Sequence, residues 1–391
     1  MDSGLTFPLR ILHVVGGLRR GGIETWLVRV LRKIDRGRFR MDFLVHTEER
    51  CDYDDEVREL GSRIIPCLRY RHPWIYRENF RRAVRGHGPY QIIHSHLHHF
   101  NGYVLYLASR SGIPVRIAHS HNDTVSLRSR AGLIRRAYLA LMGYWIRCSA
   151  TGGLAASRRA ALSLFGSGWE SDRRWRIFYY GIDPDLFRAR PEEPSIRAEL
   201  GIESSAFVIG HVGRFTEQKN HRFLIEVAAE VIGKDPAARF LLVGEGKLRP
   251  GIEREVNRRG LTGRVVFAGS RNDVPRLMRE GMDAFILPSL FEGLGMVGVE
   301  AQAAGLSLLI SDALPEEIEV VKPLVRRLSL KLPASVWAET LLSFRFSKPD
   351  ITPERACRIV ERSRFNIESC VEKLSAFYGD SWAAEKGEAD A

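Results

Sequence analysis

The stretch AFILPSLFEGLGMVGVEAQAAG, residues 284–305, contains a complete strand, loop and helix. The apolar run 284–287 predicts a buried strand, and Pro288 follows it at once. Gly293 and Gly295 then expose backbone amides at the start of a helix, which favours a bound anion such as a phosphate. A unit of this kind is typical of a parallel α/β sheet, whose ligands lie beyond the carboxyl ends of the strands.

The same alternation of strand and helix patterns extends outward in both directions and predicts two α/β domains. Predicted strands occupy residues 9–15, 41–46, 91–96, 115–121 and 176–180, and then 207–212, 240–243, 265–268, 284–287 and 308–310. Residues 181–205 are dense in Pro, Gly and charge, which predicts a linker followed by a short helix, with the two domains joined near residues 186–205. We therefore predict domains over 1–186 and 187–352, with a C-terminal helix and acidic tail over 353–391.

The bulk composition fits a globular protein of the cytoplasm. The chain has 391 residues and is 45% hydrophobic, enough for two cores. No apolar run approaches the roughly 20 residues of a membrane-spanning helix, and the N-terminus lacks the features of a signal peptide. The five cysteines are odd in number and show no CxxC spacing, which disfavours a disulfide framework or a zinc ribbon.

The charge is strongly basic and unevenly placed. A formal net charge of +12 fits nucleic acid, an anionic membrane or phosphate-bearing substrates. Residues 124–169 contain no Asp or Glu. They contain seven arginines, namely Arg128, Arg130, Arg135, Arg136, Arg147, Arg158 and Arg159. This stretch is either a solvated face or a basic patch for a membrane surface, and both readings stay open.

Charged residues follow two predicted strand ends of the second domain. Arg214 leaves the strand 207–212, and Lys219 stands five residues further on, at the expected start of a helix. An arginine fork and a lysine ammonium at the mouth of a crevice suit a diphosphate, although solvated surface charges would give the same pattern. Glu292 would oppose a phosphate but can accept hydrogen bonds from ligand hydroxyls. Glu300, further along the helix, can accept from both hydroxyls of a ribose.

The first domain offers a glycine-rich turn and a group of histidines. The turn GGLRRGGIET, residues 16–25, suits an anion but lacks the GxGxxG spacing, which argues against a dinucleotide-dependent oxidoreductase. Six histidines lie near two strand ends: His94, His96, His98, His99, His119 and His121. Without an HExxH motif or a carboxylate triad, hydrogen bonding to hydroxyls or to a developing charge is favoured over a metal site. We expect His94 and His98 to be packing or surface residues.

Five segments in chain order resemble the family 4 retaining glycosyltransferases of the GT-B architecture. They are GGxxxGGIE, GRFTEQKN, LVGEG, VVFAGSRNDV and the Glu-x7-Glu element from Glu292 to Glu300. The resemblance runs from Leu9 to about Asp312, and more loosely through the C-terminal helix. The doubled histidines of HSHLHH and AHSHND are most similar to those of members that build capsular or extracellular polysaccharides.

The resemblance implies two Rossmann-like, doubly wound domains facing a central cleft. The last helix, for which Phe365 to Tyr378 is the candidate, would cross back to the first domain. A nucleotide-diphosphate sugar, UDP-linked by family usage, would bind mainly to the C-terminal domain, and a glycan or lipid-linked acceptor to the N-terminal one. We expect a cytoplasmic enzyme, peripheral on the inner membrane face if the basic stretch binds lipid, with no nucleic-acid partner.

The resemblance also assigns residues to roles. The catalytic candidates are His119, Arg214, Lys219 and Glu292. The donor-binding candidates are Gly21, Gly22, Arg214, Lys219, Gly269, Glu292, Gly293, Leu294, Gly295, Met296 and Glu300. His96 and His121 are candidates for acceptor binding. Members of the family retain the anomeric configuration and need no metal, so no cofactor is expected and the nucleotide sugar is a substrate.

Two other functions remain as alternatives. A sugar-nucleotide epimerase of similar two-domain build would isomerise the donor without an acceptor. A nonenzymatic protein that binds membrane or nucleic acid would explain the charge but not the Glu-x7-Glu context. The chain also departs from the family at Gln302, at Ser307 and in the glycine-poor segment 311–320. The first two are expected to be structural, and the third leaves the identity of the donor sugar open.

Overall fold

The computed structural model describes residues 8–123, 132–188, 195–347 and 349–389. The chain divides into two compact units, one of residues 1–181 with 367–391 and one of residues 182–366. Arg128 and Arg130 of the basic stretch, and part of the predicted linker, lie outside the described residues. Among the helices that the structure does describe, none has both the length and the hydropathy of a membrane span.

The first unit is built on a seven-stranded parallel sheet. In spatial order its strands are β3 (Ile64–Pro66), β2 (Phe39–Val45), β1 (Leu9–Val15), β4 (Ile92–Ser95), β5 (Val115–Ser120), β6 (Gly152–Ala155) and β7 (Trp175–Ile177). Its helices are α1 (Gly22–Lys33), α2 (Asp54–Glu59), α3 (Pro73–His87), α4 (Asn101–Arg110), α6 (Leu133–Ser149), α7 (Arg158–Phe165) and α15 (Ile367–Ala389), with short turns η1 (His98–Phe100) and η2 (Trp169–Ser171).

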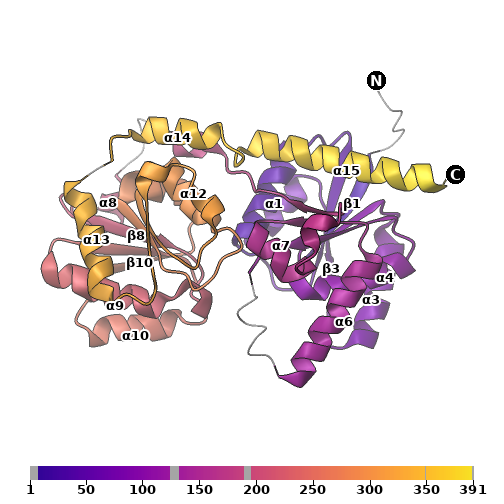
Figure 1. Cartoon of the computed structure of the whole chain (residues 1–391), viewed down its shortest axis with the longest axis horizontal. Coiled ribbons are helices and arrows are strands. Elements are labelled where there is room, and N and C mark those ends of the chain that lie inside the picture. The colour runs from indigo at the N-terminus through magenta and orange to yellow at the C-terminus, as the bar shows by residue number, and fades with distance from the viewer. Residues whose placement is uncertain (1–7, 124–131, 189–194, 348, 390–391) are drawn as a thin grey trace. The chain divides into compact units, whose positions relative to one another are not determined.

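Side chains alternate between the two faces of this sheet. Leu12 and Val14 of β1 pack into a core with residues of α3, α4, α6 and α7. His13, between them, faces the opposite side, because successive strand residues point to opposite faces. The helix α15 packs against α1 and β5 (Figure 1). The last helix therefore belongs to the first unit, which confirms the predicted return of the chain.

The second unit contains a six-stranded parallel sheet. In spatial order its strands are β10 (Val265–Gly269), β9 (Arg239–Val243), β8 (Val208–Val212), β11 (Ala284–Leu287), β12 (Ser307–Ser311) and β13 (Val325–Leu328). Its helices are α8 (Ile196–Glu199), α9 (His221–Lys234), α10 (Arg249–Arg258), α11 (Val274–Arg276), α12 (Met296–Ala303), α13 (Ala334–Phe346) and α14 (Pro353–Glu361). It also contains the 3-10 turns η3 (Pro184–Phe187), η4 (Glu217–Lys219), η6 (Glu316–Ile318) and η7 (Lys322–Leu324), and the π-helical turn η5 (Leu277–Gly281).

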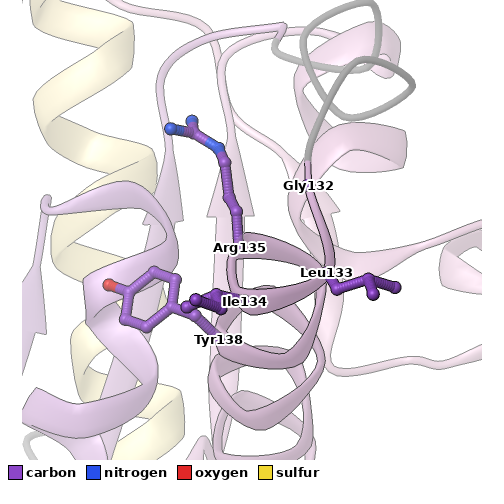
Figure 2. Close-up of a pocket in the computed structure, with 5 residues that line it drawn as sticks. All are labelled: Gly132, Leu133, Ile134, Arg135 and Tyr138. Carbon is purple, nitrogen blue, oxygen red and sulfur yellow. The ribbon is translucent and has the colours of Figure 1, made fainter.

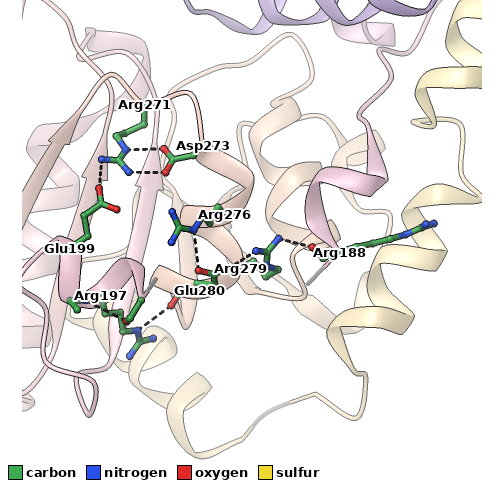
Figure 3. Close-up of polar contacts among 10 residues, drawn as sticks. Arg188, Arg197, Glu199, Arg271, Asp273, Arg276, Arg279 and Glu280 are labelled. Atoms are coloured by element: carbon green, nitrogen blue, oxygen red, sulfur yellow. Dashed lines mark hydrogen bonds and ion pairs between the residues drawn. The ribbon is translucent and has the colours of Figure 1, made fainter. Parts of the chain in front are cut away.

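Arginines fix the first residues of the second unit to the segment between β10 and β11 (Figure 3). Arg271 pairs with Glu199 and Asp273, each at 2.7 Å. Arg279 donates to the carbonyl of Arg188 over 2.7 Å. These charges explain part of the high arginine content as internal contacts rather than as a surface for a partner.

The ten predicted strands are all present, and three more, β3, β6 and β13, were missed. The prediction of one C-terminal helix from residue 353 onward was wrong, because the chain forms two helices, α14 and α15. Residues 362–366 separate them, and the isolated bridge of Ile182 with Asn366 lies in this break. The short helix α8 follows the linker as predicted.

The helices α4 and α6 approach each other closely at Gly102. A Cβ atom built on Gly102 would lie 2.3 Å from the carbonyl oxygen of Met142 on α6. Met142 and Ile146 are buried in this contact, whereas residues 133–138 of α6 are exposed. Only a glycine at this position allows the two backbones to pack at this distance.

We expect Gly102→Ala to destabilise the protein although alanine is the better helix former. The added methyl group overlaps a backbone atom, a strain of about 1–3 kcal/mol that exceeds the gain of about 1 kcal/mol from helix propensity. Gly143→Ala on α6 is the matched control, because its Cβ would come no closer than 3.4 Å to a side-chain atom. Thermal unfolding should show a lower Tm for Gly102→Ala and an equal or higher one for Gly143→Ala. A raised Tm for both would contradict the close contact.

Candidate functional site

Both sheets have the strand order 3-2-1-4, counted within each unit, and so each has a topological switch point beside its first strand. In the second unit this point lies between β8 and β11. The loops that follow these strands are joined by backbone Leu290 N donating to Gln218 O over 2.8 Å, and by Asn220 Nδ2 donating to Pro288 O over 3.2 Å. Ligands of open α/β sheets bind at such points.

Lys219 and Glu292 meet at this switch point. Lys219 Nζ lies 2.6 Å from Glu292 Oε1, and Gln218 Nε2 donates to Glu292 Oε2 over 3.2 Å. The two charged side chains are only 16% and 8% exposed. The pair is therefore largely desolvated, and each charge needs the other or a ligand to compensate it.

Two histidines that the sequence reasoning missed lie beside Lys219. His211 Nδ1 donates to Ile286 O over 2.9 Å, and its Nε2 is buried without a partner among the described residues. The ring of His221 stacks on Phe215 with centroids 4.0 Å apart. Burial lowers the pKa of His221 to about 4 and that of His211 well below 6.5, and the charge of Lys219 contributes to both shifts. Both imidazoles are therefore neutral at pH 7.

Arg214 and Gly269 lie at the same edge of the second sheet. Arg214 is exposed just past the end of β8. Gly269 ends β10, and its carbonyl accepts a hydrogen bond from Gly244 N over 2.8 Å. Because β9 lies between β8 and β10, Gly269 is roughly 10 Å from the loop of Lys219 in the direction across the strands.

The second loop of the switch point leads into α12. Gly295 caps this helix with φ of +83°, a left-handed conformation that glycine adopts without strain. Leu294 is buried before it, and Gly293 precedes Leu294. The amides of Met296 and Val297 precede the hydrogen bonds of α12 and lie at its positive dipole end, whereas Gly298 N donates to Gly295 O over 2.8 Å. Glu300 lies one turn after Met296 on the same side of α12.

Gln302 on the same helix is a structural departure from the family, as predicted. Its buried amide donates to Gly298 O over 2.9 Å and to Ile318 O over 2.8 Å. Its Oε1 accepts from Val320 N and Val321 N over 2.9 and 2.7 Å. The four bonds hold the loop after β12 against α12, in the segment where the donor specificity was left open.

The turn after β1 belongs to the first unit. Gly21 caps α1 in an extended conformation, and its carbonyl accepts from Thr25 N over 2.9 Å. Gly22 is the first residue of α1, so its amide lies at the positive dipole end of this helix. Donor binding by Gly21 and Gly22 stays a prediction.

Most of the predicted histidines lie in one hydrogen-bonded chain in the first unit. In order, the chain comprises Tyr378, His94, His119, Tyr180, His121, His96 and His13. We call these seven residues the imidazole chain. All seven are buried, and they come from β1, β4, β5, α15 and the segments that follow β4, β5 and β7.

The first half of the imidazole chain runs from α15 into the sheet. Tyr378 Oη lies 2.7 Å from His94 Nδ1, and His94 Nε2 lies 3.0 Å from His119 Nδ1. His119 Nε2 then lies 3.2 Å from Tyr180 Oη. His94 is buried, as expected of a packing residue, but it also links α15 to the predicted catalytic histidine.

The second half returns to β1. Tyr180 Oη also contacts His121 Nδ1, and His121 Nε2 lies 2.9 Å from His96 Nδ1. His96 Nε2 lies 3.0 Å from His13 Nδ1. Every ring nitrogen of His96, His119 and His121 thus already has a protein partner. None of these three side chains can bond a ligand through nitrogen without giving up a bond in the chain.

Two triplets of the chain could hold a metal ion by distance alone. The ring nitrogens of His13, His94 and His96, and those of His96, His119 and His121, lie within 4.8 Å of one another. Each triplet consists of buried imidazoles only, so a divalent cation would bring two uncompensated charges into the core. The donor set therefore disfavours a metal, and metal independence remains a proposal.

Burial holds the five histidines of the imidazole chain neutral. It lowers the pKa of His13 and of His121 to about 3. It lowers the pKa of His94, His96 and His119 well below 6.5, with neighbouring imidazoles adding to the shift. A core with five neutral imidazoles is stable only at a pH high enough to keep these imidazoles unprotonated.

The sequence reasoning missed His13, Tyr180 and Tyr378. His13 could have been found, because it shares one face of the first predicted strand with Ile11 and Val15. Tyr378 could not, because it is 284 residues from His94 and its position depends on the packing of α15.

We expect stability to fall as the pH drops below 6.5. The folded-state pKa values are lowered, so the unfolded chain binds protons between pH 6.5 and about 3 whereas the folded chain does not. Each histidine then costs about 1.4 kcal/mol per pH unit, so the five of the imidazole chain cost about 7, and His46, whose pKa burial lowers to about 4, adds to this slope. Against a typical total of about 5–15 kcal/mol, the first unit should unfold roughly one to two units below pH 6.5. Urea unfolding followed from pH 7.5 to 5 measures this slope, and a flat profile would contradict it.

Three comparisons with known proteins agree with this geometry. Residues 192–344 match the family described as Glycosyl transferases group 1. The chain is 37% identical over 338 residues to EpsF of Bacillus subtilis (strain 168), which is named as a glycosyltransferase, covering 85% of this chain and 86% of EpsF. It is 32% identical over 136 residues, about a third of each chain, to the UDP-Gal:alpha-D-GlcNAc-diphosphoundecaprenol alpha-1,3-galactosyltransferase of Escherichia coli.

Among solved structures, the chain is similar to HepE of Anabaena in complex with UDP and glucose. The TM-score is 0.79 at 18% identity, over 95% of this chain and all of that one. This likeness confirms the predicted fold class of two Rossmann-like α/β domains with parallel sheets. The match to EpsF spans most of both sequences, and the family match covers the unit with the Lys219–Glu292 pair. The chain therefore belongs to the group 1 glycosyltransferase family.

Proposed function

We propose that this chain transfers a hexosyl or N-acetylhexosaminyl group from a UDP-sugar to a lipid-linked saccharide, with retention of configuration and without a metal. The observation that carries the proposal is the desolvated pair of Lys219 and Glu292 at the switch point of the second sheet. A cation and a carboxylate there, beside the N-terminus of α12, suit a ligand that joins a diphosphate to a polyhydroxylated ring.

In this proposal the donor divides the ion pair. Lys219 turns to the diphosphate together with Arg214 and the first amides of α12. Glu292 then accepts hydrogen bonds from the sugar hydroxyls, and Glu300 accepts from the ribose. The charges left by the separated pair are compensated by the ligand, so binding does not leave either one alone in a desolvated site.

The transfer step needs no protein nucleophile. The bond from the anomeric carbon to the diphosphate breaks while the acceptor oxygen bonds to that carbon on the same face. The proton of the acceptor hydroxyl passes to the leaving phosphate. Arg214 and Lys219 accelerate this step because negative charge grows on the diphosphate in the transition state.

The acceptor class rests on two supports. The E. coli relative is named for a diphosphoundecaprenol acceptor and a UDP-sugar donor. The first unit also exposes a basic and apolar surface that suits a membrane, where such acceptors lie. We therefore propose a place in surface polysaccharide biosynthesis, at the cytoplasmic face of the membrane. An epimerase would instead isomerise the donor with no acceptor present.

The surface in question is the start of α6, here called the α6 patch: Leu133, Ile134, Arg135, Arg136 and Tyr138. Leu133 and Ile134 are 84% and 90% exposed. Figure 2 shows Leu133, Ile134, Arg135 and Tyr138 around an open pocket on this helix. Large apolar side chains next to arginines, with no acidic residue from 124 to 169, fit insertion into an anionic lipid surface.

Glu292→Ala and Lys219→Ala are each expected to abolish transfer from UDP-sugars to lipid-linked acceptors. Each also leaves a desolvated charge unpaired, at a cost of about 3–5 kcal/mol. The double variant Lys219→Met/Glu292→Gln removes both charges at similar volume. The Tm of this double variant should lie closer to that of the wild type, and the variant should still be inactive. This result separates loss of chemistry from loss of fold.

Lys234→Ala is the matched control, because Lys234 forms an exposed pair with Glu339 at 2.7 Å in the same unit. It should keep full activity. A thermal-shift screen of nucleotide sugars gives the donor, since a ligand at 100 times its Kd stabilises the folded state by about 2.7 kcal/mol. Full activity of both single alanine variants would refute the proposed function.

For the α6 patch, Arg135→Glu/Arg136→Glu should weaken binding to vesicles that contain anionic lipid at low salt. Each arginine near such a surface contributes about 1 kcal/mol, so the loss should be about tenfold or more and should shrink as salt rises. Arg82→Glu/Arg85→Glu makes the same charge change at exposed positions on α3 and should bind as the wild type. Sedimentation with the vesicles measures the binding. Unchanged binding of the α6 variant would show that the α6 patch is a solvated face and not a membrane-binding surface.

A further inference from the structure

Each link of the imidazole chain carries a single proton, and this gives the chain a direction. A neutral imidazole donates through one ring nitrogen and accepts through the other. Tyr180 has one hydroxyl proton for its two partners, His119 and His121. If one link is reversed, every other link must reverse with it to avoid two donors or two acceptors face to face.

The two ends of the imidazole chain decide between the directions. If the Tyr378 hydroxyl donates to His94 Nδ1, the chain ends at His13 with a buried Nε2–H that has no partner among the described residues. If the direction is reversed, both the Tyr378 proton and the His13 Nε2 lone pair lack a partner there. Each buried unsatisfied group costs about 1–3 kcal/mol. One such group costs less than two.

We propose that Tyr378 sets the proton order of the whole imidazole chain, so that its five histidines are all Nε2–H tautomers, and that Tyr378 and Tyr180 are positioning residues for His119 and His121. The link to catalysis rests on the proposed function and on the family resemblance, which makes His119 a catalytic candidate and His121 a candidate for acceptor binding.

The order gives the Tyr180 position a defined chemistry. His119 presents an N–H there, and His121 presents a lone pair. A hydroxyl group matches this arrangement because it accepts one hydrogen bond and donates another. The site that the histidines form is thus shaped for a hydroxyl, whether that of Tyr180 or one of a ligand that displaces it.

Trp26 of α1 packs against the rings of the imidazole chain and holds them in place. Its indole stacks on Tyr180 with centroids 4.5 Å apart and meets His119 edge-on at 5.5 Å. Its Nε1 donates to Cys370 Sγ on α15 over 3.3 Å. The helix α15 therefore supplies the Tyr378 hydroxyl, which orders the imidazole chain. It also supplies Cys370, which fixes the Trp26 ring that packs on this chain.

Tautomers are measured by 15N NMR of the full-length protein with selectively labelled histidine. In the wild type all five histidines of the chain should carry the proton on Nε2. Tyr378→Phe should give a mixture of tautomers at all five. Tyr180→Phe cuts the chain in the middle, so it should mix the tautomers of His121, His96 and His13 and leave His94 and His119 ordered by Tyr378.

Tyr103→Phe is the matched control, because this buried tyrosine donates to Pro73 O over 2.7 Å in the same unit but outside the imidazole chain. Its histidine spectrum should equal that of the wild type. If Tyr378→Phe does not fold, Tyr180→Phe decides alone, since the proposal requires it to spare His94 and His119. An Nδ1–H histidine in the wild-type chain, or stoichiometric zinc bound there, would overturn the proposal.

Steady-state kinetics test the positioning role. If Tyr378→Phe populates both directions equally and the donor binds both forms alike, kcat should fall about twofold, in proportion to the competent fraction, with the donor KM unchanged. An unchanged kcat despite mixed tautomers would overturn the positioning role. A wild type that transfers no sugar from any UDP-sugar would instead refute the proposed function, and the NMR result would still decide the proton order.

Discussion

The placement of the first strand of each unit between two parallel neighbours is the constraint on which the rest of the structure depends. The strand β1 pairs with β2 on one side and β4 on the other, and β8 likewise pairs with β9 and β11. The chain must wind in one direction from the first strand and then in the other. The loops on the two sides therefore diverge and leave a crevice at the carboxyl edge. Lys219, Glu292 and the start of α12 all lie there in the second unit.

The same constraint in the first unit brings polar residues into the core. Because β1, β4 and β5 are adjacent, histidines on one face of each strand become neighbours. Their burial would be costly if the ring nitrogens were left without partners. Linking them end to end through two tyrosines satisfies all of them but one, at the His13 end. The chain of bonds is thus the low-energy way to keep five imidazoles in a closed core.

The two units manage their polar residues differently. The second unit keeps the charged pair of Lys219 and Glu292 at its switch point. Separating this pair without a ligand costs much free energy, so the pair is suited to exchange partners with a charged ligand. The first unit keeps neutral rings at low pKa, which are suited to hydroxyl groups and sensitive to acid. The two substrates of the proposed function differ in the same way, since the nucleotide diphosphate is anionic and the saccharide is neutral and rich in hydroxyls.

Local patterns in the sequence determined the strands of strong β-branched or apolar character, the two-domain division and the residues at the strand ends. They failed for β6, which reads Gly152-Gly153-Leu154-Ala155 and has little strand propensity of its own. That strand exists because β5 and β7 pair with it on both sides. Local patterns also failed at residues 362–366, where contacts with residue 182 accompany a break in a helix that the local pattern would continue. Only the tertiary structure could show that Lys219 touches Glu292 and that Tyr378 touches His94, because those contacts join residues 73 and 284 positions apart and depend on the packing of whole elements.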